Sequence, residues 1–252
     1  MLKRISILGE DEKAQKILDK GVKSSGIQLV PVEDELLPDL TDGLLHHTSV
    51  KDALPMAVQL AEQSESILYL LAEAIGCRES FEPTSAQRVV QHATRFARAL
   101  NLDDEQRTVL ERGALLRDIG KLKIPNDILL KDGLLSYDEW KHIQDHTNIE
   151  ADLIRGMHGL SPIEDIVRCH HECYDGDGYP NKLEGDDIPY LARIVKIIDV
   201  YCAMTSPRAY RSGHSSKEDA LGHLENERGK HFDPDLVTVF LDKNVGGEIP
   251  ES

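Results

Sequence analysis

The sequence is poor in aromatic residues and in cysteine. Phe, Trp and Tyr make up 5% of the 252 residues, with a single Trp. This scarcity disfavours a surface that stacks many nucleobases, because such surfaces depend on exposed aromatic rings. The four Cys residues show no framework spacing, which favours reduced thiols and a cytoplasmic location over a disulfide-bonded secreted protein.

Long apolar runs are also missing, so neither a membrane span nor a signal peptide is expected. The opening residues MLKRISILGEDEK return to charge after only a few apolar positions, unlike a secretory leader. The formal net charge is −16, from 29 Lys and Arg against 45 Asp and Glu. This argues against broad binding to long nucleic acid or to an anionic membrane. It leaves room for a small anionic ligand in a local basic pocket.

The chain is expected to be mainly α-helical after a short segment of mixed character. Residues 3–8 and 27–32 have the pattern of strands on either side of a helix at 11–20, a β-α-β-like opening. We therefore expect a small α/β segment at 1–48 and a helical domain at 49–252. Apolar residues at three- and four-residue spacing predict helices over 50–75, 85–100, 104–117, 138–158 (one helix or two), 162–174, 189–204 and 217–241, the last interrupted at 229–234.

Acidic and histidine side chains gather at the predicted helix ends of this domain. Imidazoles and carboxylates are suitable ligands for Fe, Mn or Zn. Each of these residues alone has an ordinary role as a helix cap or a solvated group, so spacing alone leaves a metal site open. The residues are Asp118, His146 in QDHTN, His170 and His171 in CHHECYDGDGYP, and Asp199 in KIIDVYCAMTS.

Three separated segments resemble the HD-GYP family, whose members are HD-superfamily phosphohydrolases that hydrolyse cyclic di-GMP. The segments are RDIGKLKIPNDILLKDGLLSYDEW, HHECYDGDGYP and DVYCAMTSPRAYR. The second, His170 to Pro180, matches HHExxDGxGYP at every fixed position. The resemblance covers about residues 80–240 and implies an HD-domain helical bundle.

The resemblance also implies a metal centre with a ligand pocket beside it. Two cations bridged by a carboxylate would lower the pKa of a shared water, and basic side chains would offset charge on the phosphoryl oxygens. Lys121 would contact a phosphate oxygen and is assigned, with Asp118, to catalysis. The implied metal ligands are Asp118, His146, His170, His171 and Asp199. The implied ligand-binding residues are Tyr179, Arg208 and Arg211.

Two positions depart from the family pattern, and both belong to the same cation. Ser85 stands where the family has a His at the start of the domain, and Arg117 stands in place of the His of the His-Asp pair. A guanidinium beside Asp118 and Asp199 would neutralise both carboxylates and repel a cation. The alternative is an Arg117 that points to solvent. We therefore expect one divalent transition metal, such as Fe or Mn, or none.

Several other side chains have two readings on the sequence alone. His92 is weighed as a substitute ligand for the lost His at the start of the domain. Cys169 and Cys173 are weighed as further ligands, but the favoured reading is that of small buried side chains. Tyr137 and Trp140 are expected in the core rather than stacked on a base.

Three functions follow. The preferred one is a cyclic di-GMP signalling module that binds a nucleotide or a partner and hydrolyses little, because the losses are confined to one side of the site. The second is an active metal-dependent cyclic di-GMP phosphodiesterase, since Lys121, the later His residues and the GYP loop are kept. The third is a protein-interaction module without nucleotide, with a diguanylate cyclase or another signalling protein as partner. Homodimerisation is left open.

Overall fold

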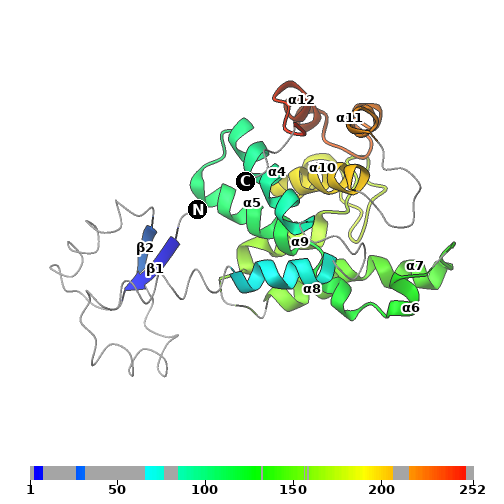
Figure 1. Cartoon of the computed structure of the whole chain (residues 1–252), viewed down its shortest axis with the longest axis horizontal. Coiled ribbons are helices and arrows are strands. Elements are labelled where there is room, and N and C mark those ends of the chain that lie inside the picture. Colours follow the sequence, from blue (N-terminus) through cyan, green and yellow to red (C-terminus); the bar gives the residue numbers. More distant parts are fainter. Residues whose placement is uncertain are drawn as a thin grey trace. The chain divides into compact units, whose positions relative to one another are not determined.

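The chain divides into two compact units, Met1–Ile67 and Leu68–Ser252. The computed structural model describes residues 3–7, 27–31, 66–76, 85–131, 133–155, 157, 159–206 and 216–247 (Figure 1). The predicted division between residues 48 and 49 falls outside the described residues and remains a prediction.

The N-terminal unit contains a two-stranded parallel sheet. Strands β1 (Lys3–Ile7) and β2 (Ile27–Pro31) pair with Lys3 opposite Ile27 and Ile7 opposite Pro31. Parallel neighbours need a crossover connection, and the helix predicted at 11–20 would lie in it, outside the described residues. The two predicted strands are confirmed, and their parallel pairing is the one that a β-α-β connection requires.

The described residues of the C-terminal unit are built mainly from helices, the first of which spans residues 66–76 and so starts two residues before the boundary at Leu68. The helices that follow are α4 (Ser85–Ala99), α5 (Asp104–Leu116), α6 (Asn126–Leu129), α7 (Tyr137–Gln144), α8 (His146–Arg155), α9 (Glu164–Cys169), α10 (Tyr190–Thr205), α11 (Lys217–Asn226) and α12 (Pro234–Asp242). Short 3-10 helices are η1 (Ile119–Lys123), η2 (Ser161–Ile163) and η3 (Gly185–Asp187). Each helical region predicted within 49–252 overlaps at least one of these helices, and residues 50–65 of the region predicted at 50–75 lie outside the described residues. The region predicted at 162–174 holds only the shorter α9, because the chain turns at His170 into the Gly-rich loop.

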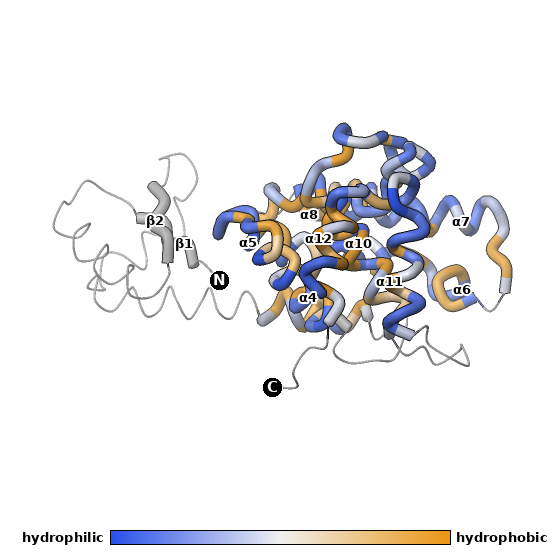
Figure 2. Tube along the Cα trace, turned by 90° about the horizontal axis from the view of Figure 1, so that it is seen from above, coloured by the Kyte–Doolittle hydropathy of each residue, from blue (hydrophilic) through white to orange (hydrophobic). Residues whose placement is uncertain are grey.

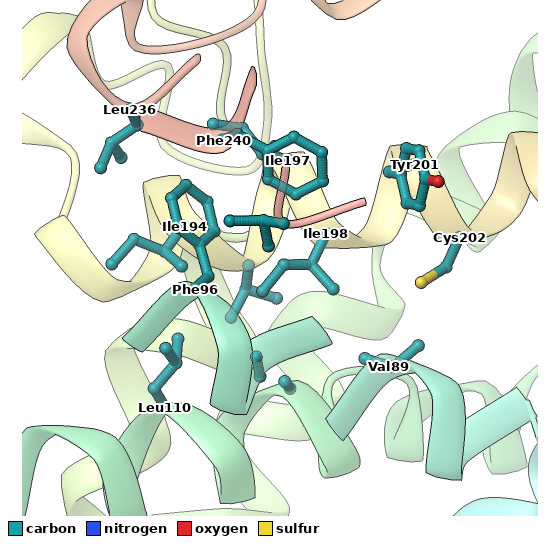
Figure 3. Close-up of a cluster of buried hydrophobic side chains, with 14 of the residues drawn as sticks. Val89, Phe96, Leu110, Ile194, Ile197, Ile198, Tyr201, Cys202, Leu236 and Phe240 are labelled. Atoms are coloured by element: carbon teal, nitrogen blue, oxygen red, sulfur yellow. The ribbon is translucent and has the colours of Figure 1, made fainter. Parts of the chain in front are cut away.

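Helix α10 lies at the centre of the larger core. It packs against α4, α5, α9, α11 and α12. Figure 3 shows Ile197 and Ile198 of α10 close to Phe96 of α4 and Phe240 of α12, and all four side chains are fully buried. Burying such a side chain contributes roughly 1.5–3 kcal/mol. Asp199, the next residue along α10, is therefore carried by a firmly packed helix.

Helix α5 belongs to two cores at once. Leu110 and Ala114 join the cluster around α10, whereas Leu115 and Leu116 join a second cluster with the helix over 66–76, α8 and α9. A helix packed on both sides near its end has little freedom to move. Its last turn therefore holds the following two residues, 117 and 118, in a defined place.

Hydrophobic and hydrophilic residues alternate along most helices of this unit (Figure 2). Their apolar faces meet inside the bundle, in the clusters described above. Among the described residues, no helix is both long enough and apolar enough to cross a membrane.

Candidate metal centre

Four segments of the helical unit bring polar side chains together at one place. The end of α5 supplies Arg117 and Asp118, and the start of α8 supplies His146. The end of α9 supplies His170–His171, and α10 supplies Asp199. The residues predicted from separated motifs therefore meet, although their roles as metal ligands remain predictions.

Three imidazoles form the middle of the site. One ring nitrogen from each of His146, His170 and His171 lies within 4.8 Å of the others. His146 donates from Nδ1 to the carbonyl of Ile143, and His170 donates from Nδ1 to that of Val167 at 2.8 Å. Both carbonyls lie in the last turn of a helix, where carbonyl groups have no partner within the helix ladder and can accept from a side chain. A carbonyl only accepts, so Nδ1 carries the proton and the Nε2 lone pair is left for a ligand.

Burial keeps these imidazoles neutral near pH 7. It lowers the pKa of His170 to about 4, and it also lowers the pKa of His146 and of His171. Neutral imidazole is the form that binds a metal. Within the part of the chain that the structure describes, Nε2 of His146 and Nε2 of His170 are buried without a hydrogen-bond partner. Such atoms are costly unless something binds them, so they fit a cation.

Two carboxylates, those of Asp118 and Glu150, lie beside His146. Ligand atoms of Asp118, His146 and Glu150 lie within 4.8 Å of one another. The Glu150 carboxylate is fully buried, and burial, followed by the charge of Asp118, raises its pKa well above the ordinary value. Glu150 is not among the residues predicted from the sequence. Its spacing in HTNIE, four residues after His146, places both on one face of α8 and is the signal that could have found it.

Arg117 links Asp118 to a third carboxylate, Asp199. Its Nε donates to Asp199 Oδ1 at 2.7 Å, and its Nη2 lies 3.2 Å from Asp118 Oδ2. Its Nη1 also donates to the carbonyl of Ala114 at 3.0 Å. Burial opposes the charge of Arg117, but Asp118 and Asp199 outweigh this effect and raise its pKa further. The ion pairing expected of Arg117 is confirmed, and the alternative of a solvent-facing Arg117 is wrong.

Asp118 is held ionised by two cations. Lys121 Nζ, one turn of η1 later, lies 2.8 Å from Asp118 Oδ1. Burial alone would raise the pKa of Asp118, but Lys121 and then Arg117 hold it well below the ordinary value. Asp199 behaves in the same way, since Arg117 lowers its pKa against the effect of burial. Both carboxylates are therefore charged at any pH above the acid range.

The GYP loop covers the histidines. The ring of Tyr179 stacks on His171, with ring centroids 4.8 Å apart and planes at 23°. The loop approaches its own start so closely that a Cβ on Gly178 would lie 2.2 Å from the backbone nitrogen of Cys173. Glu172 holds the far side of the loop, because its buried carboxylate accepts the backbone N–H of Asn181 at 2.7 Å.

The prediction that Tyr137 and Trp140 lie in the core is wrong. Their exposed fractions are 75% and 45%, and no residue of α7 is buried. Helix α7 packs mainly against its neighbours α6 and α8, and its apolar residues stay near the surface. Trp140 lies edge-on to Tyr179, with ring centroids 6.5 Å apart. It therefore borders the histidine cluster.

Other candidate ligands lie elsewhere. His92 is buried against Tyr201, with its Nδ1 3.1 Å from the carbonyl of Val245, and it is in neither ligand group found among the described residues. Cys169 is buried in a small apolar cluster, and Cys173 is buried as well, as the favoured reading expected.

For three of the residues predicted from the resemblance, Ser85, Arg208 and Arg211, the structure describes no contact of the side chain with the histidine cluster. Ser85 is the first residue of α4. Arg208 and Arg211 lie outside the described residues, so their predicted contacts with a ligand stay predictions.

The sequence matches the family model described as HD domain over residues 69–236. It is 34% identical over 189 residues to 3'3'-cGAMP-specific phosphodiesterase 2 of Vibrio cholerae, covering 74% of this chain and 36% of the relative. It is 33% identical over 251 residues to the cyclic di-GMP phosphodiesterase response regulator RpfG of Xanthomonas campestris, covering 94% of this chain and 66% of the relative. The chain thus spans about one third to two thirds of the length of these curated relatives.

Solved structures show the same fold. A cyclic GMP-AMP specific phosphodiesterase of Vibrio cholerae aligns with a TM-score of 0.55 at 19% identity, over 70% of this chain and 47% of that one. An HDGYP protein from Bdellovibrio bacteriovorus aligns with a TM-score of 0.52 at 20% identity, over 65% of this chain and 52% of that one. Together with the histidine cluster under its GYP loop, these matches place the chain in the HD-domain family, within the HD-GYP group.

Proposed function

We propose that this chain is a cyclic-dinucleotide-binding HD-GYP module that holds one divalent cation and hydrolyses little. The observation that carries the proposal is Arg117, which is paired with both Asp118 and Asp199. The pairing engages carboxylates that a second cation would need. The ligand class comes from the relatives, which are named as phosphodiesterases of cyclic di-GMP or of 3'3'-cGAMP.

The cation is assigned to Asp118, His146 and His170–His171. The neutral imidazoles and the ionised carboxylate suit Fe or Mn. Such a cation supplies Lewis-acid polarisation of a phosphoryl oxygen. Asp199, which the resemblance assigns to a metal, is instead satisfied by Arg117.

Arg117 explains why little hydrolysis is expected. A guanidinium keeps its proton at every accessible pH, so it neutralises charge but offers no position where water could be activated. Lys121 remains beside Asp118 and can offset charge on a bound phosphate. Tyr179 and Trp140 offer aromatic surface next to it. Among the described residues, the site thus retains groups that bind an anionic nucleotide, whereas a guanidinium that cannot activate water takes the place of the second cation.

Nucleotide binding should quench the fluorescence of Trp140, the only Trp of the chain. Its ring borders Tyr179 and is 45% exposed, so a base bound at the site comes within stacking distance. Cyclic di-GMP and 3'3'-cGAMP should be titrated separately into Mn²⁺-loaded protein, with GMP as the control ligand. The products should be separated by chromatography from the same samples.

Saturable quenching by a cyclic dinucleotide, with the nucleotide recovered intact, is the expected result. No quenching and no binding heat for either ligand would overturn the nucleotide part of the proposal. Rapid release of linear dinucleotide would overturn the low-hydrolysis part and establish the active phosphodiesterase instead.

Replacing Ser85 and Arg117 together by His should raise the metal content from about one to about two ions per chain, because both lost ligand positions are restored. Elemental analysis of wild-type and variant protein, purified in parallel without chelators, measures this. The single variant Ser85→His is the control and should stay at the wild-type content, since Arg117 still pairs with both carboxylates. An unchanged metal content in the double variant would contradict the assignment of these two positions.

A protein partner, a homodimer and a cytoplasmic location are further parts of the proposal. The described cysteines, Cys169, Cys173 and Cys202, are free thiols and buried. Burial raises the pKa of the Cys202 thiol to about 12, which makes it unreactive. Such thiols suit a reducing compartment.

A further inference from the structure

We propose that Glu150 is a ligand of the cation and adds a second carboxylate to its ligand set. The inference rests on the proposed function, which places one divalent cation at Asp118, His146 and His170–His171. Neither the comparisons nor the resemblance assigns a role to Glu150. The chemistry it would supply is a hard oxygen ligand for Mn²⁺ or Fe²⁺.

The distances fit a shared cation. Two ligand atoms that each lie about 2.2 Å from one ion are at most about 4.4 Å apart. Oxygens of Asp118 and Glu150 and a ring nitrogen of His146 lie within 4.8 Å of one another. A side-chain adjustment of a few tenths of an ångström would bring all three atoms into contact with one cation.

The backbone orients Glu150 toward this position. Glu150 lies one turn after His146 on α8, and its Oε1 accepts the N–H of Gly120 at 3.1 Å. A Cβ on Gly120 would lie 2.2 Å from the carbonyl oxygen of His146 and 2.7 Å from Glu150 Cγ. Because η1 packs this closely against α8, the hydrogen bond from Gly120 fixes Oε1 of Glu150. The orientation of the carboxylate, and with it the position of Oε2, is then fixed as well.

The second oxygen is the unusual feature. Glu150 is 0% exposed, and among the described residues its Oε2 has no hydrogen-bond partner. The same holds for Nε2 of His146 and Nε2 of His170. A buried acceptor without a partner is costly, and His146 belongs both to the group with Glu150 and Asp118 and to the group with His170 and His171, so a bound cation beside His146 would offset the cost. If Glu150 only accepted the N–H of Gly120, this role would account for the burial of Oε1 but not for the burial of Oε2.

The ligand set also balances charge. Asp118 is already paired with Arg117 and Lys121, whereas Oε2 of Glu150 has no hydrogen-bond partner among the described residues. A divalent cation with two carboxylates and neutral imidazoles forms an electrically neutral centre. Mixed oxygen and imidazole ligands favour Mn²⁺ or Fe²⁺ over metals that prefer thiolates.

The test is Mn²⁺ binding to Glu150→Gln, measured by calorimetry after chelator treatment and dialysis. Glutamine keeps the shape and can still accept the N–H of Gly120, but it lacks the charge. We expect the dissociation constant for Mn²⁺ to rise at least about tenfold. Asp152→Asn is the matched control, because Asp152 lies on the same helix with a side chain 72% exposed. The control should bind Mn²⁺ as the wild type does.

Thermal unfolding with and without Mn²⁺ gives a second readout. Without metal, Glu150→Gln should melt close to the wild-type temperature, because glutamine keeps the shape of the side chain and the acceptor for the N–H of Gly120. With Mn²⁺, it should gain less than the wild type, because stabilisation by a ligand follows affinity. A merely structural role would lower both melting temperatures equally. Should the Gln variant fail to fold, Glu150→Asp replaces it, with weaker Mn²⁺ binding again expected from the shorter side chain.

Two failures are distinguishable. Equal Mn²⁺ affinity in the wild type and in Glu150→Gln would overturn the ligand role of Glu150 and leave the proposed function intact. A wild-type protein that binds neither Mn²⁺ nor Fe²⁺ would overturn the cation of the proposed function, and the inference would fall with it.

Discussion

Replacing Arg117 by Met should lower the free energy of unfolding by about 3 kcal/mol in metal-free buffer, as measured by urea denaturation. The change removes the guanidinium but keeps most of the side-chain length. It leaves Asp118 and Asp199, whose side chains are only 20% and 18% exposed, without their shared cation. Losing one member of a buried ion pair is costly because the other charges stay buried. Lys121, which also pairs with Asp118, limits the loss.

Added Mn²⁺ should restore part of that stability in Arg117→Met and should stabilise it more than it stabilises the wild type. A cation can then occupy the place that the guanidinium leaves between the carboxylates. Arg155→Met is the control, because Arg155 pairs with Glu164 on the surface and its side chain is 57% exposed. Its free energy of unfolding should stay close to that of the wild type, because an exposed ion pair contributes little to stability. Equal stabilisation of wild type and Arg117→Met by Mn²⁺ would contradict the role of Arg117 as a substitute cation.

Lowering the pH from 7 to 4 should destabilise the protein, with His92 alone contributing about 3 kcal/mol of the loss. Burial lowers the pKa of His92 to about 4, against the opposing hydrogen bond to Val245. Arg95, Arg88 and Lys217 face the ring and lower it further. In the unfolded chain, a His titrates near pH 6.5, so below that pH the unfolded state binds more protons. The stabilisation is therefore complete above pH 6.5 and is lost as the pH falls toward 4.

His92→Gln should flatten this pH dependence. Glutamine does not titrate, and its amide can still donate to the carbonyl of Val245. Urea denaturation of wild type and variant at several pH values between 7 and 4 measures the slope of stability against pH. His142→Gln, a change at an exposed position, should keep the wild-type slope. Identical slopes for wild type and His92→Gln would show that the buried ring does not resist protonation.

The parts of the fold that could be predicted are those with long or fixed patterns. Helices α4, α5 and α10 carry apolar residues with helical spacing over three or more turns, so their positions followed from periodicity. The HHExxDGxGYP segment has fixed spacing, and through the resemblance it identified His170 and His171. The meeting of Arg117 with Asp199, residues 82 positions apart, rested on that resemblance and not on any local pattern.

Glu150 and Trp140 could not be placed in the same way. Both lie in short helices, where apolar and polar residues repeat too few times to define a face. Whether Trp140 is buried depends on how α7 packs against α6 and α8, and this is a tertiary property. The spacing from His146 places Glu150 on the same face of α8, but a Glu on a helix is ordinarily exposed, and the packing of Gly120 against α8 is what shows that Glu150 points inward.

The Arg117–Asp199 ion pair makes the link between the end of α5 and α10 independent of the metal supply. A metal bridge between the end of α5 and α10 would form only when the cell supplies the ion, and it would dissolve when the supply runs out. The guanidinium is part of the polypeptide, so the ion pair does not depend on the concentration of free metal in the cell. In the proposed one-cation site, a shortage of the metal would therefore affect only the histidine-lined half of the centre. In the other half, the charges of Asp118 and Asp199 are paired with Arg117, which is present in every copy of the protein.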